Sequence, residues 1–240
     1  YTGNMTGTNS SPDRLGGVPR LFRENPMLLT LSMIMFTNMF GFGMIVPVIP
    51  LYGRTFDVST TMVGLLVTSF GVARLIANYP AGRLADRVGR RKLLLFGPLI
   101  SATGALLAFL SPDYYLLVGA LSIQGLGSAT YATAAMTTLA DISSDENRGR
   151  MMSIHQGSLL LGASFGPTLG GVIGGVFGLR SVFLAGIVMY LAVATIAYFR
   201  VTETLQREGD SGGRRRDTTR TGSPLMLLMN VSFLAVAFVS

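Results

Sequence analysis

The sequence predicts an all-α integral membrane protein, with a bundle of six helices followed by the start of a seventh. Hydrophobic residues make up 49% of the 240 residues and charged residues only 13%, whereas a soluble domain carries about 25% charged residues. The charges fall in short clusters between long uncharged runs, and about 20 such residues suffice for a helix to cross about 30 Å of hydrocarbon. The runs are continuously apolar and lack the alternation of barrel strands, so we interpret them as helices.

The elements follow one another in a simple order. Residues 1–25 form a polar tail, and residues 26–199 form the unit of six helices. The predicted spans are residues 27–51, 59–81, 93–111, 114–140, 151–176 and 181–199. Residues 200–222 are rich in Arg, Gly, Asp and Thr, which is typical of a solvated linker. Apolar residues resume in residues 223–240, which we expect to begin a seventh membrane helix that the chain does not complete.

The positions of the cations predict the orientation of the chain. With the N-terminus in the cytoplasm, sixteen of the 19 Lys and Arg residues lie on the cytoplasmic side. Only Arg54 and Arg180 lie outside, and Arg74 lies within a span. Cytoplasmic loops of membrane proteins carry this excess of positive charge, so we expect a multi-pass protein of the cell membrane with a cytoplasmic N-terminus. The same distribution argues against a nucleic-acid partner, although the net charge is +7.

Residues 82–92 read GRLADRVGRRK and lie between two predicted spans, so we predict a short cytoplasmic loop. The segment resembles the loop between the second and third helices of the major facilitator superfamily of transporters, whose pattern is G-x-L-a-D-r-x-G-r-k. The resemblance implies a conformational latch made by the positions that match the pattern. These are Gly82, Asp86, Arg87, Gly89, Arg90 and Arg91. The alternative is that the arginines only anchor the topology.

Members of this family have two six-helix halves joined by a cytoplasmic linker. The resemblance therefore implies that this chain is an N-terminal portion of a twelve-helix protein, and that its main partner is the missing C-terminal half. An inverted repeat of three plus three helices is also implied, although the residues alone do not display it.

The fifth span resembles the twelve-helix drug/proton antiporters within that family. Residues 162–171 read GASFGPTLGG, which matches the antiporter pattern G-x-x-x-G-P-x-x-G-G. The matching residues are Gly162, Gly166, Pro167, Gly170 and Gly171. Glycines at every fourth position, continuing to Gly174, would line one helix face and let another backbone approach closely. Such a face can serve packing alone, or packing in a helix that also moves during transport.

Two further spans bear on the same comparison. The first span ends in GFGMIVPVIP, which resembles the first-helix signature of these antiporters, and its two prolines predict an irregular end to the helix. The fourth span departs from the antiporter pattern, because Leu121 occupies the place of an arginine that the family is thought to use in proton coupling. If a proton is coupled here, another group must carry it.

A few polar side chains lie within the predicted spans. A central arginine such as Arg74 costs about 2.5–3.5 kcal/mol on insertion scales, so it should face protein or a wet cavity. His155 is the only histidine, and imidazole can carry a proton near neutral pH. The candidates for substrate contact or coupling are Arg74, Asn38, Gln124, Tyr131, His155 and Gln156. Any of them could instead bond between helices.

The resemblance implies a secondary active transporter that exports small amphiphilic compounds by alternating access. One alternative is an uptake carrier for sugars or organic anions of the same superfamily, and another is a truncated membrane protein that acts as a partner without transport. We do not expect an enzyme, because no embedded acid pair, metal-ligand cluster or activated nucleophile is apparent. We expect no cofactor and no metal, and the chain has no cysteine.

Overall fold

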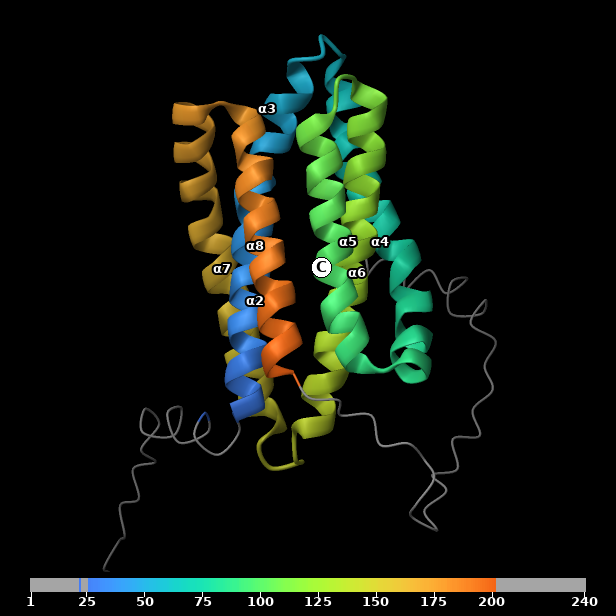
Figure 1. Cartoon of the computed structure of the whole chain (residues 1–240), viewed down its shortest axis with the longest axis vertical. Coiled ribbons are helices and arrows are strands. Elements are labelled where there is room, and N and C mark those ends of the chain that lie inside the picture. Colours follow the sequence, from blue (N-terminus) through green and yellow to red (C-terminus); the bar gives the residue numbers. More distant parts are fainter. Residues whose placement is uncertain (1–21, 23–25, 202–240) are drawn as a thin grey trace, which may run out of the picture. The chain divides into compact units, whose positions relative to one another are not determined.

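The structure, a computed structural model, describes residue 22 and residues 26–201. The described helices are α2 (Pro26–Ile45), α3 (Val48–Arg54), α4 (Thr60–Val88), α5 (Arg90–Leu110), α6 (Tyr114–Ile142), α7 (Arg148–Phe177) and α8 (Leu179–Arg200). The long helices run side by side (Figure 1), and no strand occurs in this described part, so the all-α prediction is confirmed. The predicted tail apart from Phe22, the linker beyond Val201 and the seventh helix lie outside the described residues.

Five stretches of the described helices are long and apolar enough to cross a membrane: α2 with α3, α4, α5, α7 and α8. The predicted span 114–140 corresponds to α6, which is 29 residues long but is not among those five. Its sequence is rich in Ser, Thr, Gly and Ala, and it packs against both α4 and α5. Small and weakly polar residues are enriched where membrane helices contact one another, so α6 fits the bundle interior better than a lipid-facing position.

The first predicted span, residues 27–51, matches the candidate membrane span Pro26–Arg54, which consists of two helices. α2 ends at Ile45 and α3 begins at Val48. Pro47 has a φ of −69° and no N–H group, which removes one donor from the helix ladder. Pro50 lies in the first turn of α3, where a backbone N–H would have no partner within the helix. The two prolines therefore separate α3 from α2, which agrees with the irregular helix end predicted from the sequence.

Local chemistry sets the other helix starts. The Ser59 hydroxyl accepts a hydrogen bond from the Met62 N–H at 3.4 Å, and the Asp113 carboxylate accepts one from the Leu116 N–H at 2.8 Å. Both residues are N-caps, which satisfy backbone donors in the first turn. Gly178 alone separates α7 from α8, with a φ of +90°, in a region that only glycine enters at little cost.

The neighbour relations of the helices contain an internal repeat. α2 packs against α7 and α8, α6 packs against α4 and α5, and α5 also packs against α8. When α2, α4 and α5 are mapped in order onto α6, α7 and α8, every one of these pairs maps onto another pair or onto itself. The bundle is thus two three-helix units with the same pairing, as in transporters built from internal repeats.

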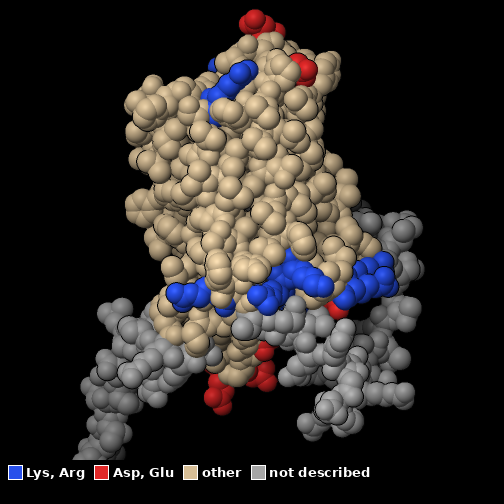
Figure 2. Space-filling view, in the orientation of Figure 1, with Lys and Arg blue, Asp and Glu red and all other residues tan. Residues whose placement is uncertain are grey.

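The two ends of the bundle differ in charge. We call the basic end the one where α4 meets α5, α6 meets α7 and α8 stops. Figure 2 shows Lys and Arg gathered there. The described cations at this end are Arg83, Arg87, Arg90, Arg91, Lys92, Arg148, Arg150 and Arg200, whereas the opposite end has Arg54 and Arg180. The hydrophobic core lies between the ends in two clusters, one around Tyr131 and Leu139 and the other around Tyr52 and Phe183.

Candidate functional site

The segment predicted as a loop over residues 82–92 is almost entirely helical, which corrects that prediction. α4 continues to Val88 and α5 begins at Arg90, so Gly89 alone separates them. Gly89 has a φ of +105°, which a residue with a Cβ rarely adopts. Arginine, leucine and alanine favour helices, and nothing between Gly82 and Val88 interrupts the hydrogen bonding of α4 after its apolar part has ended.

Two of the predicted latch residues are bound within the bundle. Arg90, at the start of α5, forms an ion pair with Asp141 at the end of α6. Next to it, the Arg91 side chain donates a hydrogen bond from Nη2 to the Tyr198 carbonyl of α8, at 3.0 Å. Both contacts are charge-assisted, which makes them stronger than neutral hydrogen bonds. They fasten the first turn of α5 to two neighbouring helices at the basic end.

Asp86 and Arg87 behave differently. Both side chains are exposed on the last turns of α4. Within the described part of the chain, Asp86 makes no ion pair or hydrogen bond. Gly82 is half-buried, and a Cβ built on it would come no closer than 4.0 Å to Thr133, so it is not a site of close helix approach. The structure therefore divides the predicted latch into two fastened arginines and an accessible carboxylate.

The glycine face predicted on the fifth span is real and packs against α2. Gly162, Gly166, Gly170 and Gly174 are all buried. A Cβ built on Gly162 would lie 2.5 Å from the Phe36 carbonyl oxygen. One built on Gly166 would lie 2.6 Å from the Phe40 carbonyl oxygen, and one on Gly170 would contact the Met44 backbone. No real Cβ fits at such distances, so the two backbones touch directly, as small residues permit in membranes.

The other two residues of the antiporter-type motif do not belong to this contact in the same way. Gly171 is exposed, and a Cβ built on it meets nothing within 4 Å. Pro167 is exposed as well, but its Cδ would lie 3.3 Å from a Cβ built on Gly43. α7 continues unbroken through Pro167. Of the five motif residues, three therefore form the packed face and Pro167 lies at its edge.

Two of the polar candidates are used to join helices. Gln124 of α6 donates a hydrogen bond from Nε2 to the Tyr190 hydroxyl of α8 at 3.0 Å, and both side chains are buried. The Tyr131 hydroxyl of α6 points to the Met35 sulfur of α2 at 3.7 Å, and Tyr131 is fully buried. Both side chains thus make contacts between helices, which is the alternative stated for the polar candidates.

Three buried polar side chains lack a partner among the described residues. The exposed fraction is 1% for His155 on α7, and it is 2% for Asn38 and 4% for Ser32, both on α2. Both ring nitrogens of His155, Nδ2 of Asn38 and Oγ of Ser32 make no hydrogen bond there. Gly162 of α7 contacts Phe36 and Met39 of α2. Seven residues, or about two turns, earlier on both helices, His155 of α7 lies level with Ser32 of α2. Unpaired buried groups are rare in native proteins and call for an explanation.

The last two candidates differ from one another. Arg74 is half-buried on α4, and its side chain makes no hydrogen bond or ion pair in the part of the chain that the structure describes. Its backbone nitrogen would lie 3.3 Å from a Cβ built on Gly125, so α4 and α6 are close at this level. Gln156 is exposed on α7 and points away from the buried groups of that helix.

Sequence analysis missed one polar cluster, at the end opposite the basic end. Arg180 of α8 donates from Nε to the Tyr52 hydroxyl at 2.8 Å and from Nη2 to the Ser111 carbonyl at 3.2 Å. Tyr52 belongs to α3, and its hydroxyl also donates to the Ser111 carbonyl at 3.3 Å. From the sequence, Arg180 is predicted only to be a cation on the outer side. No local pattern could have revealed the cluster, because its three members are separated by 59, 69 and 128 residues in sequence.

Comparison with known proteins gives consistent matches. The model of the Major Facilitator Superfamily matches residues 31–240. Multidrug resistance protein 2 of Bacillus subtilis (strain 168) is 30% identical over 183 residues, which cover 75% of this chain and 46% of the relative. The class H tetracycline resistance protein of Pasteurella multocida is 29% identical over 188 residues, covering 77% of this chain and 46% of the relative. The chain thus spans about half the length of these curated relatives.

Solved structures agree at the level of the fold. The crystal structure of the human organic anion transporter MFSD10 (TETRAN) superposes with a TM-score of 0.65 at 16% sequence identity. The match covers 75% of this chain and 48% of that one. At this identity the similarity concerns the arrangement of helices and not the substrate.

Proposed function

The chain belongs to the major facilitator superfamily, and on that premise we propose that it is the N-terminal half of a secondary active exporter of small amphiphilic compounds. Two of its relatives are named for resistance to drugs and to tetracycline, which supports export over uptake. Members of this family work by rocking one six-helix half against the other around a site near the bilayer midplane. The five described stretches that are apolar enough to cross a membrane, together with α6, would correspond to one such half.

The observation that carries the proposal is the contrast between Asp86 and its neighbours at the basic end. Arg90 and Arg91 hold α5 against α6 and α8, so this half can move as one body. Asp86 is exposed at the same end with no partner in the described residues. It is available to the C-terminal half. A contact made in only one conformation shifts the balance between conformations by its own free energy.

The same charges support the proposed orientation. Eight of the described cations lie at the basic end and two at the opposite end. Cytoplasmic segments carry the excess of Lys and Arg in membrane proteins. We therefore assign the basic end, and with it the N-terminus and the Asp86 latch, to the cytoplasm.

We assign proton coupling to His155. The usual arginine of the fourth helix is replaced by Leu121, and imidazole exchanges a proton near neutral pH. His155 is buried on α7 and has no hydrogen-bond partner among the described residues, so its ring nitrogens are not committed to another contact there. α2, which packs most closely on α7, has no charged residue between Pro26 and Ile45. The charged residues of α8 lie at its two ends, Arg180 and Arg200.

A second candidate, transport of organic anions, rests on Arg74. This half-buried cation lacks a carboxylate partner in the described helices. Embedded charges usually pair with one another or mark a substrate pathway, so Arg74 would favour an anionic substrate. The two candidates share a mechanism and differ in the charge of what is carried.

Flux in membrane vesicles tests the proposal. The reading frame that contains this chain is expressed, and a fluorescent cationic dye and a fluorescent anionic dye are offered to inverted and right-side-out vesicles. We expect the cationic dye to accumulate in inverted vesicles whose interior is more acidic than the medium. Nigericin collapses this proton gradient and should abolish the accumulation. Accumulation in right-side-out vesicles alone would identify an uptake carrier. Flux of the anionic dye alone supports the second candidate, and no flux of either dye contradicts both.

For the assignment of His155, the change His155→Gln retains polarity and removes the titrating group. Transport by the variant should lose its dependence on the proton gradient while dye still equilibrates across the membrane. Unchanged gradient dependence at equal expression would exclude His155 as the coupling group.

A further inference from the structure

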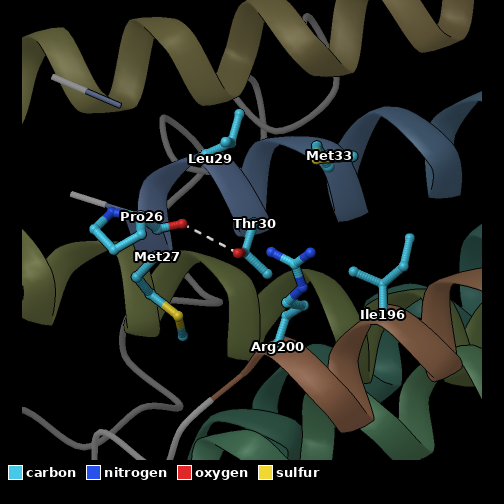
Figure 3. A pocket seen from close by; sticks show the side chains of 7 residues that line it. All are labelled: Pro26, Met27, Leu29, Thr30, Met33, Ile196 and Arg200. Atoms are coloured by element: carbon cyan, nitrogen blue, oxygen red, sulfur yellow. Dashed lines mark hydrogen bonds between the residues drawn. The ribbon is translucent and has the colours of Figure 1, made fainter. Parts of the chain in front are cut away.

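A cavity of about 360 Å³ opens at the basic end, between the first turns of α2 and the last turn of α8. It is lined by Pro26, Met27, Leu29, Thr30, Met33, Ile196 and Arg200. Figure 3 shows the Arg200 guanidinium extending across the cavity toward Thr30, with apolar side chains around it. The Thr30 hydroxyl already donates to the Pro26 carbonyl at 3.1 Å. Within the described residues, the guanidinium itself has no hydrogen-bond or ion-pair partner.

A second cavity of about 380 Å³ lies on the other side of the same turn of α8. Its lining residues are Arg91, Lys92, Leu95, Ala197 and Tyr198. Among the described residues, Arg91 bonds the Tyr198 carbonyl through Nη2 only, so its other N–H groups remain available there. Neither cavity has a carboxylate among its lining residues. The last turn of α8 is therefore flanked on both sides by cations above an apolar floor.

The outward face of α8 leads to this turn. Its large exposed side chains are Leu184, Val188, Leu191, Tyr198 and Phe199, with exposed fractions between 46% and 76%. The first three are spaced four and three residues apart and so lie on one helix face. The rings of Tyr198 and Phe199 stack edge to face with centroids 5.1 Å apart, next to the cations. Aromatic residues at this position mark the depth at which hydrocarbon gives way to headgroups.

We propose that the end of α8 binds an anionic phospholipid from the leaflet at the basic end. The lipid headgroup would lie over the last turn of α8, with Arg200 on one side of it and Arg91 and Lys92 on the other, and its acyl chains would follow the apolar face of α8. Basic pockets between membrane helices suit such headgroups, and the arginine fork matches phosphate oxygens. A soluble anion would use the cations but leave the apolar floor uncovered. The site bridges α2, α5 and α8, so the bound lipid fastens these helices together.

The proposal is tested on the full chain purified in an uncharged detergent. Phosphatidylglycerol, phosphatidylcholine and inorganic phosphate are titrated separately, with bound lipid measured by native mass spectrometry and stability by thermal unfolding. We expect phosphatidylglycerol to bind and to raise the unfolding temperature, and phosphatidylcholine and phosphate to do neither. Equal binding of the two lipids overturns the proposal without any variant. If inorganic phosphate raises the unfolding temperature as much as phosphatidylglycerol does, the proposal of a lipid ligand is wrong and the site binds a soluble anion.

Variants locate the site. The triple change Arg91→Gln, Lys92→Gln and Arg200→Gln removes the three proposed cations. Each cation near a lipid surface strengthens the binding of an anionic lipid several-fold, so the loss of all three should weaken binding of phosphatidylglycerol on the order of 100-fold. The matched control is Arg83→Gln, Arg148→Gln and Arg150→Gln, which removes three exposed cations from the same end and should retain the binding. Equal losses in both triples would mean that the lipid responds only to the overall charge of the basic end.

Discussion

Gly166 of α7 and Gly43 of α2 pack backbone against backbone. A Cβ built on Gly166 would lie 2.8 Å from the Gly43 Cα, and one built on Gly43 would lie 3.3 Å from the Gly166 Cα. The nearest atoms are backbone, apart from the rigid ring of Pro167, whose Cδ would lie 3.3 Å from the Cβ built on Gly43, so nothing flexible can move aside to make room. α7 and α2 can therefore approach this closely only because neither position 166 nor position 43 has a Cβ.

The first prediction compares two glycines of α7. Gly166→Ala should destabilise the bundle by about 1–3 kcal/mol, the usual cost of overpacking, because the methyl group meets the Phe40 carbonyl and the Gly43 backbone. Gly171→Ala meets nothing within 4 Å and should be neutral or slightly stabilising, since alanine favours helices. Unfolding in detergent at graded denaturant measures both. Equal stability of the two variants would contradict the packed face.

The motion of α7 is tested with larger changes. Gly166→Leu should impair transport strongly, whereas Leu160→Ala should not, because Leu160 is exposed. Flux at equal surface expression compares the two. Equal activity would mean that the glycine face is not needed in transport.

The second prediction concerns Asp86. Asp86→Asn should leave insertion and stability within about 0.5 kcal/mol of the parent, as expected for an exposed side chain away from the core. Transport should fall at least tenfold, because a contact that favours one conformation is lost. The measurements are thermal unfolding and dye flux on the same preparation. Transport at the parental rate would exclude the latch, and parallel losses of stability and flux would indicate a merely structural role.

The third prediction concerns the ion pair between Arg90 and Asp141, which is partly exposed, with 18% and 32% of the side chains accessible. A double-mutant cycle with Arg90→Gln and Asp141→Asn should give a coupling energy of about 0.5–1 kcal/mol, the range of solvent-accessible pairs. The coupling should shrink at high salt because exposed charges are screened. No coupling at low salt would show that α5 is held to α6 by packing alone.

The fourth prediction concerns the hydrogen bond from Gln124 to Tyr190. Tyr190→Phe removes the acceptor and leaves the amide of a buried glutamine without its partner. The cost should be about 1 kcal/mol, in line with hydrogen bonds between membrane helices. Tyr198→Phe is the control, because Tyr198 is exposed and its hydroxyl makes no hydrogen bond within the described residues. Comparable losses in both variants would mean that the bond contributes nothing specific.

The fifth prediction concerns Arg74, the charge within α4. Arg74→Gln retains hydrogen bonding and removes the charge, so it separates electrostatics from packing. Insertion should be normal, and the ratio of anionic to cationic dye flux should fall several-fold. If the ratio and its pH profile match the parent, the charge of Arg74 plays no part in selecting the substrate.

The sequence by itself determined the membrane class, the order of the helices, the excess of charge at one end and the glycine face of α7. Each of these four features follows from local composition or from a periodic pattern along one helix, and none of them depends on which helices become neighbours. It predicted the irregular exit at Pro47 for the same reason, since proline removes its own backbone donor wherever it lies.

Only the tertiary structure decided what the polar side chains do. Gln124 and Asn38 have similar amides in similar apolar surroundings of sequence, yet Gln124 bonds Tyr190 and the Asn38 nitrogen bonds nothing in the described part. Arg90 and Asp86 belong to one motif, yet Arg90 reaches Asp141 and Asp86 remains accessible. No pattern in the sequence indicates the cluster of Tyr52, Ser111 and Arg180. A hydrogen bond requires two atoms within about 3 Å, and for residues tens of positions apart only the packing of the helices sets that distance.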